Sequence, residues 1–193
     1  SGDGFRPRTR FSNFVNLNEL CNLFGEVFDI AKTADMNLKL PAIQNGKPEM
    51  IICEKSPEQE LQTDAGIERA RRIEAKMVQP DEDNMLAVCT YMTKVALDAR
   101  IIDPEAVEYD GGKVALCAEK IIEINKANPG TAQAIFCDTN TPKKDAFSVY
   151  QALRDRLVRS GEFAENEIAF VHDAANDKQR LAMFEKVNNA EIK

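Results

Sequence analysis

Two polar loops hold the side chains of this sequence that are best suited to chemistry. The stretch 138–144 reads Asp-Thr-Asn-Thr-Pro-Lys-Lys, and the stretch 172–176 begins with His172, the one histidine among 193 residues. Hydroxyl, amide and ammonium groups in front of a helix can hold a phosphate, because the helix N-terminus offers free N–H groups. The simpler interpretations are an ordinary turn capped by Thr141 and a surface or capping role for His172.

The sequence lacks the motifs of most nucleotide-dependent and hydrolytic enzymes. It contains no GxxxxGK[ST] phosphate loop, no GxGxxG, no GxSxG and no HExxH. Gly111-Gly112-Lys113 has neither the upstream glycine nor the preceding strand that a phosphate loop needs, and the acidic run 81–84 follows a proline in a loop. We therefore assign no catalytic residue and no cofactor-binding residue to this chain, and expect it to be inactive by itself.

The cysteines and the apolar runs argue against a metal centre and a membrane span. No CxxC spacing occurs, and each cysteine lies in an apolar pattern typical of a small buried side chain. An odd number of free thiols fits a reducing cytoplasm. No apolar run approaches the ~18 residues of a membrane span. We expect a cytoplasmic protein with no metal site and no membrane partner. The five cysteines are Cys21, Cys53, Cys89, Cys117 and Cys137.

The charge is acidic overall and unevenly distributed. The formal net charge is −7, with +2 in residues 1–10, −9 in residues 11–142 and zero in residues 143–193. A free-standing nucleic-acid-binding domain is usually basic. Any contact of this chain with nucleic acid must therefore be local.

Hydrophobic periodicity predicts a succession of helices. The clearest start is Ser56-Pro57-Glu58-Gln59, which combines an N-cap serine, a proline at the first helical position and a glutamine three residues after the cap. Asn128-Pro129-Gly130 and Ser160-Gly161 are strong stop signals. The expected helices cover residues 16–32, 57–77, 85–99, 113–127, about 146–159 and 178–187.

Short apolar runs between these helices predict strands. They lie at 50–53, 132–138 and 168–171, and residues 190–193 look like the opening of another strand. Alternating helices and strands favour βαβ units and a parallel sheet, whose ligands bind at the carboxyl ends of the strands. We expect an α/β fold with 133–138 as the central strand. The expected core side chains are Ile51, Ile135, Phe136, Ile168, Phe170 and Val171.

Several segments resemble, in order, the second RecA-like lobe of Snf-type translocases of helicase superfamily two. The matching stretches are Lys39-Leu40-Pro41, 49–59, the helix at 85–101, Gly111-Gly112-Lys113, 133–138 and 168–173. The sequence of residues 8–14 and 33–36 is most similar to that of helicase–DNA methylase proteins of phages and conjugative elements. Gly111 departs from the serine of the family, and the fifth and sixth motifs would lie beyond Lys193.

The resemblance implies a RecA-like parallel sheet flanked by helices and incomplete at the C-terminus. Residues 1–46 would be the inter-lobe connection with a helical extension, and 47–193 a partial C-terminal lobe. The parent protein would be a DNA-dependent ATPase, a helicase or translocase of a DNA modification or mobile-element system, and would bind ATP and Mg²⁺. The partners of this lobe would be DNA and the first helicase lobe.

Within that resemblance, the two polar loops would face DNA. The residues that would contact its backbone are Thr139, Thr141, Lys143, Lys144 and His172. Such contacts position a duplex without reading its sequence. The sequence contains no (N/D)PP(Y/F) loop, so the methylase half of the fusion proteins is not part of this chain.

Two other interpretations remain open at the level of the sequence. The chain could be a protein-interaction or scaffold domain that performs no nucleotide chemistry. It could also be a small-molecule enzyme that uses the crevice at the strand ends, although no acid–base pair can be named for it.

Overall fold

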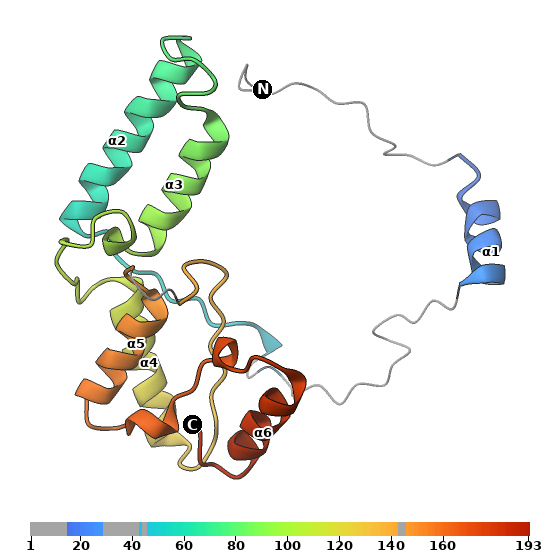
Figure 1. Ribbon diagram of the computed structural model, residues 1–193, viewed down its shortest axis with the longest axis vertical. Coiled ribbons are helices and arrows are strands. Elements are labelled where there is room, and N and C mark those ends of the chain that lie inside the picture. Colours follow the sequence, from blue (N-terminus) through green and yellow to red (C-terminus); the bar gives the residue numbers. More distant parts are fainter. Residues whose placement is uncertain (1–14, 29–42, 44–45, 143–145) are drawn as a thin grey trace. The chain divides into compact units, whose positions relative to one another are not determined.

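The computed structural model describes residues 15–28, 43, 46–142 and 146–193 (Figure 1). The chain divides into two units, Phe5–Met50 and Ile51–Lys193 together with Ser1–Gly4. In the first unit, helix α1 (Leu17–Val27) carries an exposed apolar face on which the rings of Phe24 and Phe28 stack 5.4 Å apart. Among the described residues, no helix is long and apolar enough to cross a membrane.

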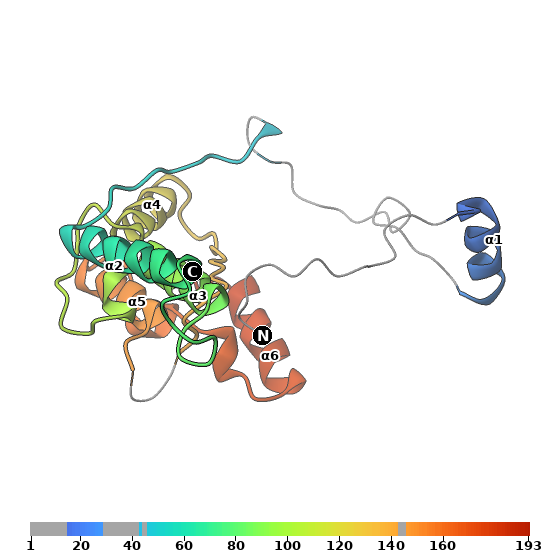
Figure 2. The same cartoon turned by 90° about the horizontal axis from the view of Figure 1, so that it is seen from above.

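The described part of the second unit is built from helices. Figures 1 and 2 both show α2 running beside α3, and α4 running beside α5. Helix α6 follows near the C-terminus. The helices are α2 (Pro57–Glu74), α3 (Met85–Leu97), α4 (Lys113–Ala127), α5 (Val149–Arg159) and α6 (Asp177–Asn188), with 3-10 turns at Ala99–Ile101, Glu165–Glu167 and Val171–Asp173.

Helices α2 and α3 form a hairpin whose start is fixed by the expected capping box. Ser56 Oγ accepts from the N–H of Gln59 at 3.1 Å, and Gln59 Oε1 accepts from the N–H of Ser56 at 3.0 Å. The same glutamine also donates through Nε2 to the carbonyl of Val95 at 2.6 Å, so the cap is tied to the end of α3. The capping-box prediction is confirmed, and the cap has a second role that its local motif did not reveal.

The two hairpin helices approach closely and are held at their far end by an ion pair. Gly66 lies against Met92, and a Cβ atom at position 66 would overlap Met92 Sδ. Arg69 donates two hydrogen bonds to Asp83, both at 2.8 Å, and its guanidinium lies over the ring of Tyr91. These contacts hold α2 and α3 together, and Gln62 Nε2 also donates to the carbonyl of Ala99, in the 3-10 turn after α3, at 3.1 Å.

A small apolar core lies between α4 and α5. Its buried members are Ala118 and Ile121 on α4, Leu157 on α5 and Phe163 in the following loop. Helix α4 begins at Lys113 and ends at Ala127, as the sequence predicts. The helices expected at 57–77, 85–99 and 178–187 are likewise confirmed, with ends that differ by a few residues. Helix α1 is shorter than the expected 16–32 and ends at Val27.

The predicted α/β fold is wrong. The described residues contain no strand, so neither the RecA-like parallel sheet nor a central strand at 133–138 is present in this part of the chain. Phe136 is 91% exposed and Ile135 46% exposed, where a doubly covered strand would bury both. Ile51 and Val171 are also exposed, and Ile168 and Phe170 are only half-buried.

The polar contacts of the segment 131–138 explain why a strand pattern did not give a sheet. Gln133 Nε2 donates to the carbonyl of Ile121 at 2.9 Å, and the Tyr150 hydroxyl donates to the carbonyl of Cys137 at 2.6 Å. The segment is thus tied to α4 and α5 by single side chains. An apolar run favours an extended chain, but a sheet also needs a neighbouring segment at about 4.8 Å that pairs with it residue by residue.

Candidate nucleic-acid interface and an adjoining polar cavity

The loop after Asp138 is closed by one side chain, Asn140. Its Oδ1 accepts from the N–H of Val149 at 2.6 Å, and its Nδ2 donates to the carbonyl of Phe147 at 3.1 Å. Asn140 has φ = 56°, in the left-handed region, which asparagine tolerates better than most residues. The side chain therefore joins the two ends of the loop and satisfies the first N–H of α5.

This geometry corrects the expected start of the helix after the loop. Helix α5 begins at Val149, so Ala146 precedes it and is exposed. Thr141 is not its cap, because Asn140 takes that role. The N–H of Val149 is occupied by Asn140, and this group of the helix start is not offered to a phosphate.

Tyr150 joins the two polar loops that the sequence singles out. Its hydroxyl donates to the carbonyl of Cys137, next to the loop that holds Thr139 and Thr141. Its ring meets the ring of His172 edge-on, with centroids 5.3 Å apart, and the ring of Phe170 at 5.8 Å. The structure thus brings His172 and the start of the first loop to the same end of α5.

The five predicted contact residues are differently placed. Thr139 is half-buried, and its carbonyl accepts a hydrogen bond from Cys137 Sγ at 3.2 Å. Thr141 and His172 are exposed. Lys143 and Lys144 lie outside the described residues. Burial raises the pKa of Tyr150, and negative charge on the neighbouring Cys137 and Asp138 side chains raises it further, so its hydroxyl stays protonated as a donor.

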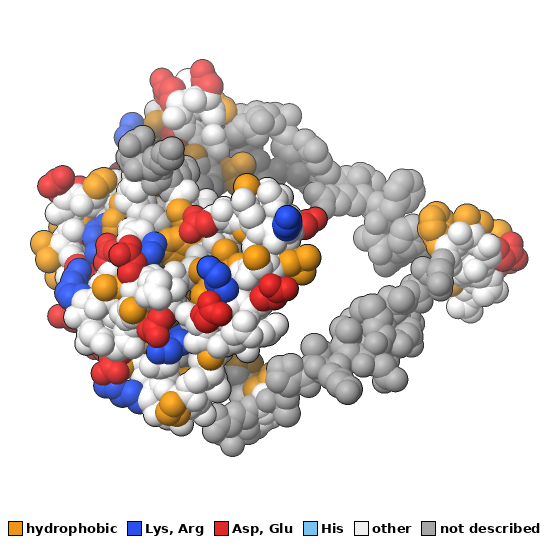
Figure 3. Space-filling model, turned by 60° about the horizontal axis from the view of Figure 1, so that its bottom comes forward, with side chains coloured by type: hydrophobic (Ala, Val, Ile, Leu, Met, Phe, Trp, Pro, Cys, Tyr) orange, Lys and Arg blue, Asp and Glu red, His pale blue; other side chains and the backbone are white. Residues whose placement is uncertain are grey.

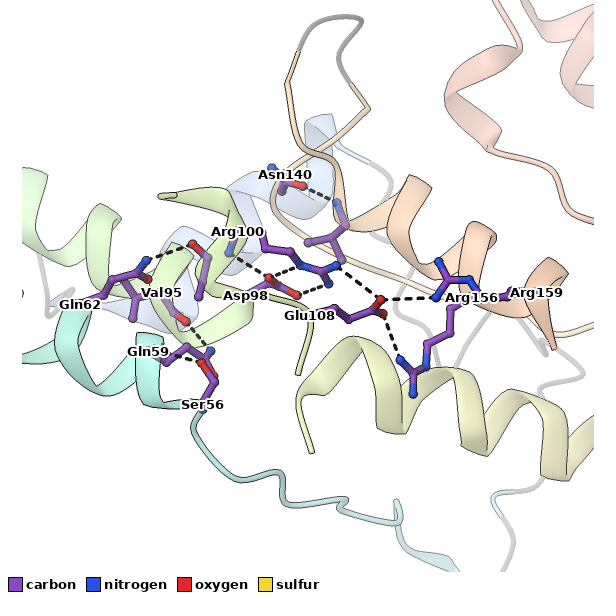
Figure 4. Close-up of polar contacts among 12 residues, drawn as sticks. Ser56, Gln59, Gln62, Val95, Asp98, Arg100, Glu108, Asn140, Arg156 and Arg159 are labelled. Carbon is purple, nitrogen blue, oxygen red and sulfur yellow. Dashed lines mark hydrogen bonds and ion pairs between the residues drawn. The ribbon is translucent and has the colours of Figure 1, made fainter. Parts of the chain in front are cut away.

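On the other side of α5, an ion-pair group that we call the Glu108 cluster links the acidic loop to the helix (Figure 4). Glu108 accepts from Arg156 at 3.0 Å and lies 3.5 Å from Arg159 and 3.9 Å from Arg100. Arg100 in turn binds the carboxylate of Asp98 through two nitrogens, at 2.9 and 2.8 Å. The members of the cluster are Asp98, Arg100, Glu108, Arg156 and Arg159.

The arginines at the centre of this cluster are committed to their carboxylates. The Arg100 side chain is only 12% exposed, and its guanidinium also lies 4.7 Å from the centre of the Phe147 ring. Hydrogen bonding to Asp98 raises the pKa of Arg100 despite the opposing effect of burial. Hydrogen bonding to Asp110 likewise raises the pKa of Arg156, and Glu108 adds to the effect. Arg100 and Arg156 therefore hold the fold and are not free cations for phosphate.

A half-open hollow of about 420 Å³ lies along α5 from Ser148 to Arg159, and its lining includes Arg100 and Glu108 of the cluster. Ser148 lines it and is 7% exposed, and its Oγ has no hydrogen-bond partner in the described part of the chain. Serine at an N-cap normally accepts from a backbone N–H of the first helical turn. Here Ser148 makes no such bond, and Asn140 binds the N–H of Val149 instead.

The structure adds residues that sequence reasoning missed. Asn140 lies nine positions before its partner Val149, and Glu108 lies 48 positions before Arg156, so no local motif connects either pair. A signal was available for Tyr150, because an inward tyrosine needs a partner for its hydroxyl. Within the described ranges, no group of three or more His, Cys, Asp or Glu side chains could hold a metal ion.

Comparison with known proteins identifies no relative of this chain. No protein-family model, no curated protein and no solved structure matches the chain.

Proposed function

We propose that this chain is part of a DNA-dependent ATPase of the helicase or translocase class, in which it grips the DNA backbone. The ordered sequence resemblance supports the class of protein. One structural observation supports the contact site: Tyr150 holds the loop at 137–141 and His172 at the same end of α5.

The chemistry of this end suits a phosphate backbone. The hydroxyl groups of Thr139 and Thr141 can donate hydrogen bonds to phosphate oxygens, and the His172 imidazole can donate from a ring nitrogen. The lysines at 143 and 144 would add charge next to this loop. Such contacts are independent of base sequence, so the chain would position DNA without selecting a site.

The charge of the chain sets an upper limit on the affinity of the contact site for DNA. The face drawn in Figure 3 mixes acidic and basic side chains and shows no continuous basic field. Residues 11–142 carry a net charge of −9, which repels DNA at long range. We therefore propose weak binding by this chain alone, with firm binding only in the parent protein.

The residues of this chain do not fit ATP and Mg²⁺. The sequence has no phosphate loop, and the described residues hold no cluster of metal ligands. By the resemblance, the parent protein would bind both, and this chain would contribute no reacting group. Purified alone, it should release no phosphate from ATP in a steady-state assay, with or without DNA. Turnover that persists after repeated purification would contradict this assignment.

A salt titration of fluorescence anisotropy with duplex DNA tests the contact site. Each lost phosphate contact lowers the slope of log affinity against log salt by about 0.9. The double variant Lys143→Ala/Lys144→Ala should lower affinity equally for different sequences and flatten the slope by up to about 2. The matched control is Lys76→Ala/Lys94→Ala, which removes the same charge from the α2–α3 hairpin.

The two double variants separate a local contact from a general effect of charge. Equal slopes for the wild type and Lys143→Ala/Lys144→Ala would contradict the proposed site. Equal losses in the two double variants would also contradict it, because they would show that only net charge matters.

One observation favours the alternative of a protein-interaction domain. Large apolar side chains outside the core of the second unit are exposed at Ile52 and Phe136, each by more than 80%. Large exposed apolar side chains can belong to a surface that another protein covers. This alternative is favoured if the purified chain, without any partner protein, binds no DNA at low salt.

A further inference from the structure

Helix α3 has an outer face that lies on the side away from α2 (Figure 1). Its side toward α2 carries Tyr91, Met92 and Val95, which meet that helix through two hydrogen bonds and the close contact at Gly66. With about 3.6 residues per turn, the residues half a turn round the helix from these form the outer face. The four residues along the middle of this face, which we call the α3 seam, are Leu86, Thr90, Thr93 and Leu97.

The α3 seam is exposed although it contains no charged side chain. Leu86 is 77% exposed, both threonines are exposed, and Leu97 is half-buried. Lys94 is the one charged residue among the 13 of α3, and it lies beside the seam, whereas α2 carries charged side chains along its whole length. A helix with so few charges is usually covered on all its sides. The seam is therefore suited to contact with another apolar surface.

The two threonines of the seam use their hydroxyl protons within their own helix. Thr90 Oγ1 donates to the carbonyl of Leu86 at 2.9 Å, and Thr93 Oγ1 donates to the carbonyl of Cys89 at 2.9 Å. A hydroxyl that bonds its own helix in this way can be covered by apolar groups at a smaller cost than one that depends on water. The seam can thus be covered along its whole length, at its threonines as well as at its leucines.

The spacing of the seam is the same when it is read in either direction. Its members are separated by four, three and four residues, which is the spacing of contact positions in paired helices. In an antiparallel pair of two such helices, Leu86 of each copy meets Leu97 of the other, and Thr90 meets Thr93. Large side chains then meet at both ends and small ones at the centre. A two-fold pair uses the same surface twice, so it requires this kind of self-complementarity.

The lack of charge on this face argues against two other partners. A surface that binds nucleic acid needs several cations, and α3 supplies one, Lys94. A helix that lies on a lipid surface usually has a broad cationic face opposite its apolar face. The opposite side of α3 instead packs against α2. A second copy of the same seam requires neither feature.

We propose that two copies of this chain pair through their α3 seams, as antiparallel helices related by a two-fold axis. A helix of 13 residues is about 20 Å long, so the interface is small. Small interfaces form weak and transient complexes, and the dimer therefore depends on concentration. The pairing does not use the DNA contact site, so this inference goes beyond the proposed function and is independent of it.

Sedimentation equilibrium of the full chain from about 1 to about 300 μM tests the pairing, because small interfaces usually dissociate in this range. The weight-average mass should rise from that of one chain toward that of two. Leu86→Glu should raise the dissociation constant at least about tenfold, because its carboxylate would face an apolar surface without a counter-charge. The matched control is Leu61→Glu, which adds the same charge at a 71% exposed leucine of α2 and should leave the dissociation constant unchanged.

A second set of variants tests the orientation of the pair. Thr93→Lys should weaken the dimer, and Thr90→Glu/Thr93→Lys should recover it, because the antiparallel pair places each glutamate opposite a lysine of the other copy. Phe24→Glu, on the exposed apolar face of α1, should leave the dimer intact. Circular dichroism verifies that each variant is folded, and Thr93→Lys replaces Leu86→Glu as the disrupting variant if the latter does not fold.

Each of four outcomes would overturn the proposal. The first is the mass of a single chain at every concentration, which would leave the α3 seam to a different protein. The second is equal weakening by Leu86→Glu and Leu61→Glu, which would show that added charge matters and its position does not. The third is loss of the dimer in Phe24→Glu but not in Leu86→Glu, which would place the pairing on α1. The fourth is failure of the double variant to recover the dimer, which would contradict the antiparallel pairing.

Discussion

The α2–α3 hairpin and the loop region around α5 are held together in different ways. The hairpin depends on a capping box, a close helix contact and one ion pair, and its key groups bond to each other. The loop region depends on single side chains, Asn140 and Tyr150, that each bind backbone carbonyls or N–H groups far along the chain. The hairpin is thus held mainly by contacts between its own two helices. The loop region presents exposed polar groups and contains the buried hydroxyl of Ser148, which has no partner in the described residues. Such a division is expected when one part of a domain gives rigidity and another binds.

The largest effect on stability should come from disrupting the α2–α3 hairpin. Gln59→Ala removes the bond to Val95 and half of the capping box, and leaves the Val95 carbonyl without its donor. We expect the free energy of unfolding to fall by about 2 to 3 kcal/mol, because buried hydrogen bonds of this kind are worth about 1 kcal/mol each and an orphaned group costs more. Urea unfolding followed by circular dichroism measures it. Gln151→Ala, at an exposed position on α5, is the control, and an equal loss there would contradict the special role of Gln59.

A somewhat smaller effect should come from opening the loop. Asn140→Ala removes two hydrogen bonds and places alanine in a left-handed conformation, so unfolding should become easier by about 2 kcal/mol. Asn140→Gly loses the same bonds but tolerates the backbone angle, and should lose less. Equal stability of the wild type and Asn140→Ala would show that this side chain does not close the loop. The control is Asn128→Ala at the exposed end of α4.

Tyr150→Phe separates stability from binding. The variant keeps the ring against His172 but loses the bond to the Cys137 carbonyl, and should lose about 1 kcal/mol of stability. DNA affinity should fall by a larger factor in Tyr150→Phe than in the matching variant Tyr91→Phe, which removes the hydrogen bond from the Tyr91 hydroxyl to the Gln62 carbonyl in the hairpin. Anisotropy at low salt measures both. Equal DNA affinity of the two variants would contradict a role of Tyr150 in positioning the contact site.

The smallest effect should be a pH-dependent contribution of the hairpin ion pair. Hydrogen bonding to Arg69 holds the pKa of Asp83 below its ordinary value of 3.8. A lowered pKa in the folded state stabilises the fold above the unfolded pKa, and this contribution disappears as the pH falls through the folded pKa. The difference in unfolding free energy between the wild type and Asp83→Asn should be about 1 kcal/mol at pH 7 and should shrink progressively as the pH falls below 3.8 through the lowered pKa of the folded state. A difference that grew on acidification would contradict the assignment.

The contrast between the two regions also explains what the sequence could predict. The two helices of the hairpin could be predicted because their sequence signals are local. These signals are the Ser56–Gln59 spacing, the proline at position 57 and the apolar repeat that starts at Met85. The sheet was predicted wrongly because apolar runs such as 132–138 do not reveal whether a second segment pairs with them. In the structure these runs bond to side chains of neighbouring helices.

The site was predictable only in part. Thr139, Thr141 and His172 could be selected because polar residues follow apolar runs in both loops. The groups that position them could not, because Asn140, Tyr150 and Glu108 act on partners 7 to 48 residues away. The unused hydroxyl of Ser148 was also hidden, since its lack of a capping bond depends on the structure around it.

The central claim is that the end of α5, and not the hairpin, meets DNA. The most direct measurement is a titration of the isotope-labelled chain with duplex DNA, followed by amide resonances in two-dimensional NMR. We expect concentration-dependent shifts at Thr139, Thr141 and His172, and none along α2 and α3. Shifts that are confined to the hairpin, or spread evenly over the whole chain, would contradict the account.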